Sequence, residues 1–111
     1  EFRPHNRLIT CAALSVSERK KAASIIGEKL MKSKGPTAFI MTHGGFDDWD
    51  REGEWAFDQN AINSFHEEMK NILKEPVKYY EIKQNINEPE FTNLALQIFD
   101  EWLDEGLIKI N

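Results

Sequence analysis

The sequence HGGFDDWDREGEWAFD, residues 43–58, decides how this chain is organised. It holds three of the six glycines, two of the three tryptophans and six of the nineteen acidic residues. The apolar run at residues 38–41 precedes it and is typical of a buried strand, and an amphipathic stretch typical of a helix follows it. Most connections in compact domains take about two to six residues, so a loop of this length indicates a functional role.

Outward from this loop, the hydrophobic pattern predicts three strands that alternate with three helices. The strands are expected at residues 8–14, 37–42 and 77–83, and the helices at residues 16–33, 59–74 and 89–104. Strands separated by helices form a parallel sheet with right-handed crossovers. The predicted fold class is therefore α/β, a single three-layer, Rossmann-like half-domain over residues 1–111 with a small, mainly parallel sheet. Residues 107–110 would add a short strand or pack as a tail.

Capping residues mark where the three helices begin. Ser15 and Glu18 form a capping box, Asp58 is a good N-cap, and Asn87 and Glu90 have the spacing of a further capping pair. Periodicity also predicts which side chains each helix buries. For the first helix these are Ala22, Ile26 and Leu30.

Composition excludes several classes of partner. The net charge is −5, and it divides into +5 over residues 1–36 and −10 over residues 37–111. Nucleic-acid binding needs a basic face near the functional loops, which are acidic here, so no nucleic acid is expected as a partner. No apolar stretch approaches the roughly 20 residues that span a membrane. The single cysteine, Cys11, reads as a buried thiol, and a cytoplasmic location is expected.

In a parallel sheet the loops after the strands meet at one edge, so residues 14–17, 43–58 and 84–88 should lie together. We therefore predict a ligand-binding site at this edge. Its members are Gly44, Gly45, Asp47, Asp50, Gly53, Asn85 and Asn87.

No metal site is assigned to this edge. Asp48, Asp50, Glu52 and Gly53 match the start of a calcium loop, but its twelfth position is Gln59 rather than the required Glu. Asp50 and Asp58 are expected to serve structure first, as a turn residue and a helix cap.

Three histidines are candidate catalytic groups. His5 precedes the first strand, which places it at the opposite edge of the sheet unless its segment folds back. His43 ends a strand, where a general base could sit, although a structural role is the simpler interpretation. His66 is read as a surface residue beside Glu67 and Glu68. No catalytic residue is assigned.

Several segments together resemble the Tm-one-like ATP-binding family. They are the run Gly44-Gly45-Phe46-Asp47-Asp48-Trp49-Asp50-Arg51-Glu52-Gly53, then Phe57-Asp58, then Asn85-Ile86-Asn87-Glu88-Pro89-Glu90-Phe91, with His5-Asn6 and Thr10 near the start. This chain departs from the family pattern at three positions. Ala13, Asp47 and Asn85 stand where the family has arginine, serine and histidine.

The resemblance implies a protein of two Rossmann-like subdomains that binds ATP, with this chain as the C-terminal subdomain. Its expected partners are the N-terminal subdomain of the same protein and a second copy, giving a homo-oligomer. We therefore expect a ligand-binding and assembly module. Two other classes stay open. One is half of a hydrolase or lyase site in which His43, Asp47, Asp50 and Asp58 act on a small anionic or carbonyl substrate, and the other is a protein-interaction scaffold.

Overall fold

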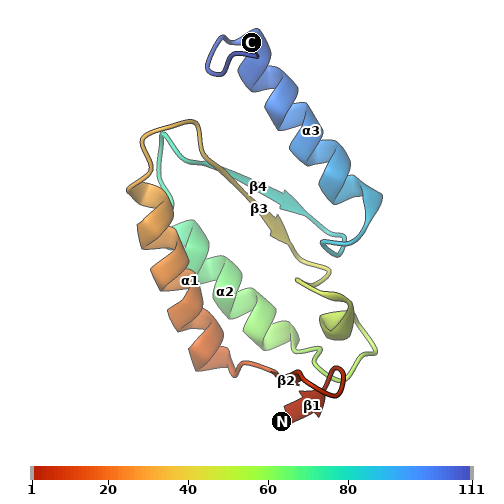
Figure 1. The fold of residues 1–111 in the computed structure, drawn as a ribbon. Coiled ribbons are helices and arrows are strands. Elements are labelled where there is room, and N and C mark those ends of the chain that lie inside the picture. Colours follow the sequence, from red (N-terminus) through yellow and green to blue (C-terminus); the bar gives the residue numbers. More distant parts are fainter. Residues whose placement is uncertain (1, 111) are drawn as a thin grey trace.

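The computed structural model describes residues 2–110, and its elements follow one another as drawn in Figure 1. The strands are β1 (Phe2–Pro4), β2 (Thr10–Ala12), β3 (Ala38–Thr42) and β4 (Lys78–Ile82). The helices are α1 (Val16–Met31), α2 (Gln59–Ile72) and α3 (Pro89–Asp104), with a short 3-10 turn, η1, at Asp48–Asp50. The prediction of an α/β chain with three helices is confirmed.

Local capping chemistry accounts for two of the three helix starts. Ser15 and Glu18 form the predicted capping box at α1, and the Asp58 carboxylate accepts the Ala61 amide hydrogen at α2. The predicted capping pair at α3 is wrong. This helix begins at Pro89 after Glu88, which makes no side-chain cap, and the fixed φ of proline suits a first helical turn.

The sheet is smaller than predicted. β3 and β4 pair in parallel, with Ala38 opposite Lys78 and Thr42 opposite Ile82, and in residues 2–110 this parallel sheet has two strands. The predicted strand at residues 8–14 does not join it. Only Thr10–Ala12 is extended, and it pairs antiparallel with β1 as a separate hairpin. The prediction of a third parallel strand is therefore wrong for residues 2–110, and the Rossmann-like half-domain is not confirmed.

A turn at Asn6 explains why the first apolar run leaves the sheet. The Asn6 side chain accepts the amide hydrogens of Leu8 and Ile9, and the His5 amide donates to the Ile9 carbonyl at 2.7 Å. Asparagine favours such turns because its short side chain bonds the backbone two residues on. The turn folds residues 2–4 back onto residues 10–12, so Cys11 lies in an exposed hairpin and is half-buried rather than buried.

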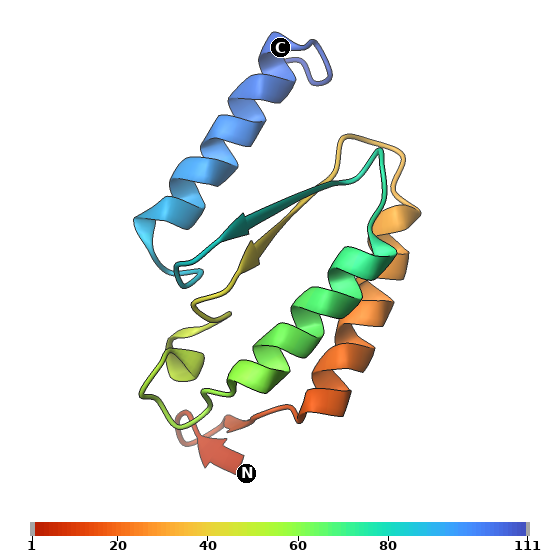
Figure 2. The same cartoon turned by 180° about the vertical axis from the view of Figure 1, so that it is seen from behind.

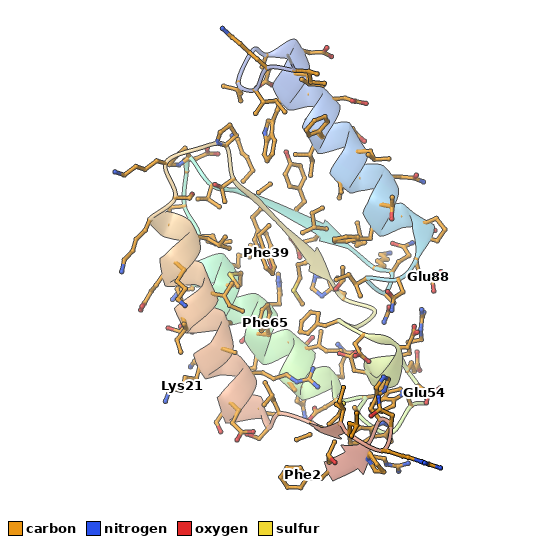
Figure 3. The ribbon with its side chains drawn as sticks, in the orientation of Figure 1. Phe2, Lys21, Phe39, Glu54, Phe65 and Glu88 are labelled. Carbon is orange, nitrogen blue, oxygen red and sulfur yellow. The ribbon has the colours of Figure 1, made fainter. Side chains whose placement is uncertain are left out.

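Helices lie on both sides of the parallel strand pair. α1 and α2 pack together on one side and α3 lies on the other, as the two opposite views show (Figures 1 and 2). The main core lies between α1, α2 and the strands, where Figure 3 labels Phe65 on α2 and Phe39 on β3. Its buried members are Ala23, Met41, Ile62, Phe65, Met69, Leu73 and Val77.

The buried face of α1 differs from the predicted one. Arg19, Ala23 and Gly27 are buried, whereas Ile26 keeps 39% of its surface exposed. Gly27 explains the shift, because a methyl group there would lie 2.9 Å from the Ile72 side chain. The small residues of α1 face α2 so that the two helices can approach closely.

On the other side of the strands, α3 is less deeply packed. Ile98 is its buried side chain, and Leu96 and Phe99 are exposed. The tail forms no strand over residues 107–110; its amides at Leu107 and Ile108 bond back to the Trp102 carbonyl. In the part of the chain that the structure describes, every helix is too short or too polar to cross a bilayer.

Candidate functional site

The predicted loop residues do meet, because the loops after β3 and β4 are held together by Asn85. Its amide nitrogen donates to the carbonyl oxygens of Gly44 (3.1 Å) and Asp47 (2.7 Å), and its amide oxygen accepts the Asn87 backbone hydrogen. The Asn85 side chain is buried, at 3% exposure. Asn85 therefore joins the loops after the two parallel strands and does not present its amide to solvent.

Asp50 fixes the turn inside the central loop. Its carboxylate accepts the amide hydrogens of Phe46 and Asp47 at 2.9–3.0 Å, and Arg19 Nη1 on α1 lies 3.7 Å away. The prediction that Asp50 shapes a turn is confirmed, although it bonds amides that precede it. The side chain that bonds an amide two residues on is Asp47, which accepts from Trp49.

Gly44 and Gly45 serve close packing between the two loops. A methyl group on Gly44 would lie 2.5 Å from the Asn85 backbone nitrogen. Gly45 has φ +115°, and a methyl group there would lie 2.5 Å from the Asp50 carboxylate. Both positions need glycine because neighbouring loop atoms fill the space, which leaves no room there for a ligand.

The outer rim of the loop carries an ion-pair network. Arg51 donates to Asp48 and to Glu88, and thereby ties the loop to the start of α3. Asn87 Nδ2 also donates to Asp48. Hydrogen bonds from Arg51 and Asn87 hold the pKa of the Asp48 carboxyl below its usual value.

The predicted site is thus brought together, but most of its polar groups bond one another. Gly44, Gly45, Asp47, Asp50, Asn85 and Asn87 all belong to the network. Gly53 stands apart at a turn with φ +92°. The carboxylates of Asp50 and Asp58 accept hydrogen bonds from backbone amides. The alternative hydrolase or lyase site, in which these two residues act together with His43, would need the same carboxylates.

A cleft of about 390 Å³ opens beside this loop, between the hairpin, α1 and the loop itself. Its lining is mainly apolar. The lining includes Cys11, Ala12, Ala13, Leu14, Ala22, Ile26, Phe46, Trp49, Trp55 and Phe65, with Arg19, Asp47 and Asp50 among them. His5 also folds back to this region, and its ring meets that of Trp49 edge-on at 5.4 Å.

Two buried polar groups beside the cleft make no hydrogen bond within residues 2–110, although one of them, Arg19 Nη1, forms the ion pair with Asp50. The other is Trp55 Nε1. Arg19 also donates through Nη2 to the Ala56 carbonyl at 3.4 Å, and its guanidinium lies 6.0 Å from the Phe46 ring. The sequence could not reveal this pair, because periodicity does not predict that an arginine is buried.

Large apolar side chains of residues 2–16, one of which (Leu14) lines the cleft, are open to solvent. Leu8 is 94% exposed and Phe2 is 78% exposed, and both lie on the hairpin. Ile9, Leu14 and Val16 are also exposed. Soluble monomers rarely leave such side chains gathered in one place, and a gathered patch marks a surface that another structure covers.

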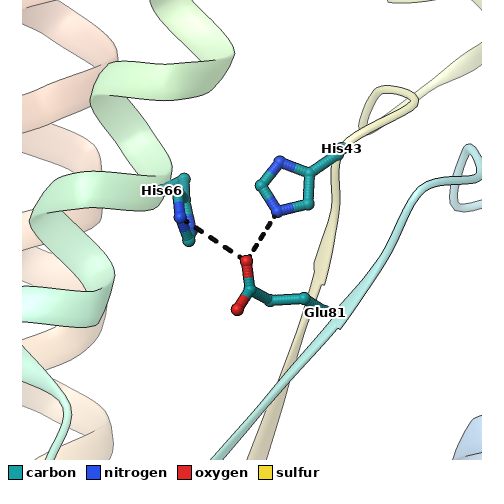
Figure 4. A group of neighbouring side chains, drawn as sticks. All are labelled: His43, His66 and Glu81. Carbon is teal, nitrogen blue, oxygen red and sulfur yellow. Dashed lines mark hydrogen bonds and ion pairs between the residues drawn. The ribbon is translucent and has the colours of Figure 1, made fainter.

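A separate group forms where β3, β4 and α2 face one another (Figure 4). His43 Nε2 lies 2.9 Å from Glu81 Oε1, and His66 Nε2 lies 3.5 Å from the same oxygen. His66 Nδ1 lies 2.7 Å from the Tyr79 hydroxyl. The prediction that His66 faces outward is wrong. It follows Ile62 by four residues and precedes Met69 by three, so it lies on the buried face of α2, and this spacing could have revealed it.

Local contacts shift the pKa values in this group. The hydrogen bond from His43 lowers the pKa of Glu81, and partial burial lowers the pKa of His66. Burial raises the pKa of the Tyr79 hydroxyl.

Comparison with known proteins agrees with the resemblance of the loop segments. Residues 1–103 match the model of the C-terminal domain of an uncharacterised protein family, UPF0261. The chain belongs to this family. A UPF0261 protein from Brucella melitensis is 36% identical over 107 residues, which are 96% of this chain and 26% of that protein. A UPF0261 protein from Clostridium tetani is 30% identical over 88 residues, or 78% of this chain and 22% of that protein.

More distant similarity reaches a plant protein. The ToMV resistance protein Tm-1(GCR237) of Solanum lycopersicum is 27% identical over 99 residues, which are 87% of this chain and 13% of that protein. The predicted relationship to the Tm-one-like proteins is confirmed. The chain spans only about a quarter of the length of the Brucella relative that it matches.

Proposed function

We propose that this chain is a ligand-binding and assembly module of a longer UPF0261 protein. Its cleft would receive an N-terminal subdomain of the same polypeptide. The observation that carries the proposal is the mainly apolar cleft together with the exposed apolar side chains of residues 2–16. A structure from outside residues 2–110 that covered this apolar lining would stabilise the cleft by removing apolar surface from water.

The exposed apolar residues of the hairpin support the same partner. Burying a leucine or phenylalanine side chain stabilises by about 1.5–3 kcal/mol, so Phe2, Leu8 and Leu14 offer a large gain to a structure that covers them. The Brucella relative is about four times as long as the part that matches, so in that protein the same polypeptide contains further structure that could cover these residues. We therefore prefer the rest of the polypeptide to an unrelated protein.

The parallel strand pair offers a second place of assembly. β3 and β4 each have one neighbour in the described sheet, and parallel sheets are usually larger and covered on both faces. Strands from the rest of the protein would extend this pair into the Rossmann-like sheet that the family resemblance implies. Pairing between two copies, as in the predicted homo-oligomer, is the alternative source of such strands.

ATP is the ligand that the Tm-one-like resemblance implies for the intact protein. On this chain, the groups that could reach it are the exposed side chains of Asp47, Asp48 and Asn87, because Asp50 and Asn85 are buried. Two exposed carboxylates suit the magnesium ion that accompanies nucleotide phosphates better than the phosphates themselves. We propose that the rim of the loop contributes to such a site together with residues from another part of the protein.

Hydrogen exchange tests the assembly proposal. The backbone amides of residues 8–14 should exchange quickly in the isolated chain and become protected in the intact natural protein. Leu14→Asp should remove this protection, whereas Leu96→Asp on α3 should retain it, since both leucines are exposed in this chain. Equal exchange of residues 8–14 in the isolated chain and in the intact protein would contradict the proposal.

Calorimetric titration of the intact protein with MgATP tests the ligand proposal independently. Asp48→Ala should weaken binding, and Glu105→Ala, an exposed acidic residue at the end of α3, serves as the control. If the intact protein shows no heat of binding, or if both variants bind like the parent, ATP is not the ligand of this loop.

A further inference from the structure

We propose that His43, His66 and Glu81 form a binding site for a divalent transition-metal ion such as Zn²⁺. The inference does not depend on the proposed function, because these three residues lie outside the cleft and the loop rim. Two imidazoles and one carboxylate are a common set of protein ligands for zinc, and they leave at least one position on the ion open.

Backbone geometry brings the three side chains to one place. His43 directly follows β3, Glu81 lies on β4, and the strand register sets Met41 opposite Glu81. Side chains alternate along a strand, so His43 points to the same face as Met41, and Glu81 to the same face as Tyr79. That face is covered by α2, which supplies His66 (Figure 4). The end of β3, the strand β4 and the helix α2 therefore each supply one ligand.

The distances suit a single ion. One nitrogen of each histidine and one oxygen of Glu81 all lie within 4.8 Å of one another. Zinc binds nitrogen and oxygen at about 2.0–2.2 Å, so ligands around one tetrahedral ion are roughly 3.4 Å apart. Small rotations of exposed side chains would convert the present spacing into that geometry. The two histidines point Nε2 toward Glu81, so the correct nitrogens already face the shared centre.

Tyr79 supplies the outer contact that metal-bound histidines usually have. Its hydroxyl lies 2.7 Å from His66 Nδ1, on the side of the ring away from Glu81. Such a partner fixes the ring orientation and leaves Nε2 for the ion. The Tyr79 ring is itself held in place, because it stacks on Phe39 at 6.0 Å. The orientation of His66 is therefore built into the core.

Access and charge also allow an ion to bind. The side chains of His43, His66 and Glu81 are 28%, 20% and 41% exposed, so an ion can enter and keep a water ligand. Lys70 Nζ lies 4.0 Å from the second Glu81 oxygen and is 63% exposed, so it can swing away when an ion takes its place. A simple hydrogen-bonded trio without metal is the competing interpretation.

Zinc titration of the intact natural protein, freed of metal by chelation, separates the two interpretations. Affinity is measured by competition with a chromophoric chelator, and Co²⁺ serves as a spectroscopic substitute. We expect His43→Gln, His66→Gln and Glu81→Gln each to weaken binding by more than the roughly 10–100-fold that loss of an outer partner costs. Tyr79→Phe should weaken it within that smaller range. His5→Gln and Glu75→Gln, which lie outside the group, should bind zinc like the parent.

Tyr79→Phe keeps the test decisive if a ligand variant fails to fold, because it retains the stacked ring and removes only the hydroxyl. Thermal unfolding of each variant without metal identifies those that fold. Zinc should also raise the melting temperature of the parent but not that of the folded ligand variants. The proposal is overturned if the parent binds no zinc, or if the folded variants of the group bind it as tightly as the His5→Gln and Glu75→Gln controls.

Discussion

The central loop and the N-terminal hairpin are built in opposite ways. The loop, residues 43–58, is polar and rich in glycine, yet Asp50 and Asn85 tie its backbone into a packed unit. The hairpin contains the apolar residues 8–14, yet Leu8 and Leu14 face solvent. The difference teaches that composition does not decide burial here. The loop supplies its own hydrogen-bond partners, and the hairpin lacks the apolar surface that would cover it.

Among the substitutions in the loop, Gly45→Ala should lower the free energy of unfolding most. The substitution forces a β-carbon into φ +115° and to within 2.5 Å of the Asp50 carboxylate. We expect the isolated chain to lose about 3 kcal/mol of unfolding free energy in urea denaturation. Gly53→Ala is the matched control, since φ there is +92° but no atom lies near the added methyl group, and it should cost about 1–2 kcal/mol. Equal losses in the two variants would show that the loop is not packed around Gly45.

Removing the charge of Asp50 should cause the next largest loss of unfolding free energy. Asp50→Asn weakens bonds to two amides and the pairing with Arg19, and we expect a loss of about 2–3 kcal/mol. Asp58→Ala removes a single cap bond to Ala61 and should cost about 1 kcal/mol. Thermal scans of the isolated chain check both values. Two variants as stable as the parent would mean that these carboxylates serve a ligand instead of the fold.

Leu8→Ser should change the stability of the isolated chain least. It tests whether the hairpin is covered in the intact protein. Leu8 is 94% exposed, so the isolated chain should keep its stability to within about 0.5 kcal/mol. In the intact protein the same change should cost about 2 kcal/mol if the remainder of the polypeptide covers the hairpin. The measurement is the difference between the two losses, and a difference near zero would mean that Leu8 is exposed in both forms.

The parts of the fold that sequence predicted well depend on neighbouring residues. Ser15 with Glu18, and Asp58 alone, cap their helices through contacts within three residues, so the sequence contains the whole interaction. The apolar run at residues 8–14 is different. An apolar run indicates that a segment tends to be buried, but it does not indicate against which element. Here the Asn6 turn pairs residues 10–12 with residues 2–4 and not with the parallel sheet.

The candidate sites divide in the same way. The loop network could be predicted because parallel strands bring their following loops to one edge, and Asn85 does meet Gly44 and Asp47 there. The group of His43, His66 and Glu81 was missed because its members are far apart in the chain and no short motif connects them. Only the rotation of α2 and the register of β4 bring them together, and both are set by tertiary packing.

The parallel pairing of β3 with β4 also has a consequence for the order of folding. Every registered pair joins residues forty positions apart, as Ala38 and Lys78 do, whereas the hairpin joins residues at most ten apart. Pairing of distant residues costs chain entropy before the new contacts stabilise the chain, so local contacts form sooner. Pulse-labelled hydrogen exchange during refolding should therefore protect α2 before β3 and β4. Until β4 pairs with β3, His43 has no Glu81 and Gly44 has no Asn85, so neither candidate site exists before this distant pairing forms.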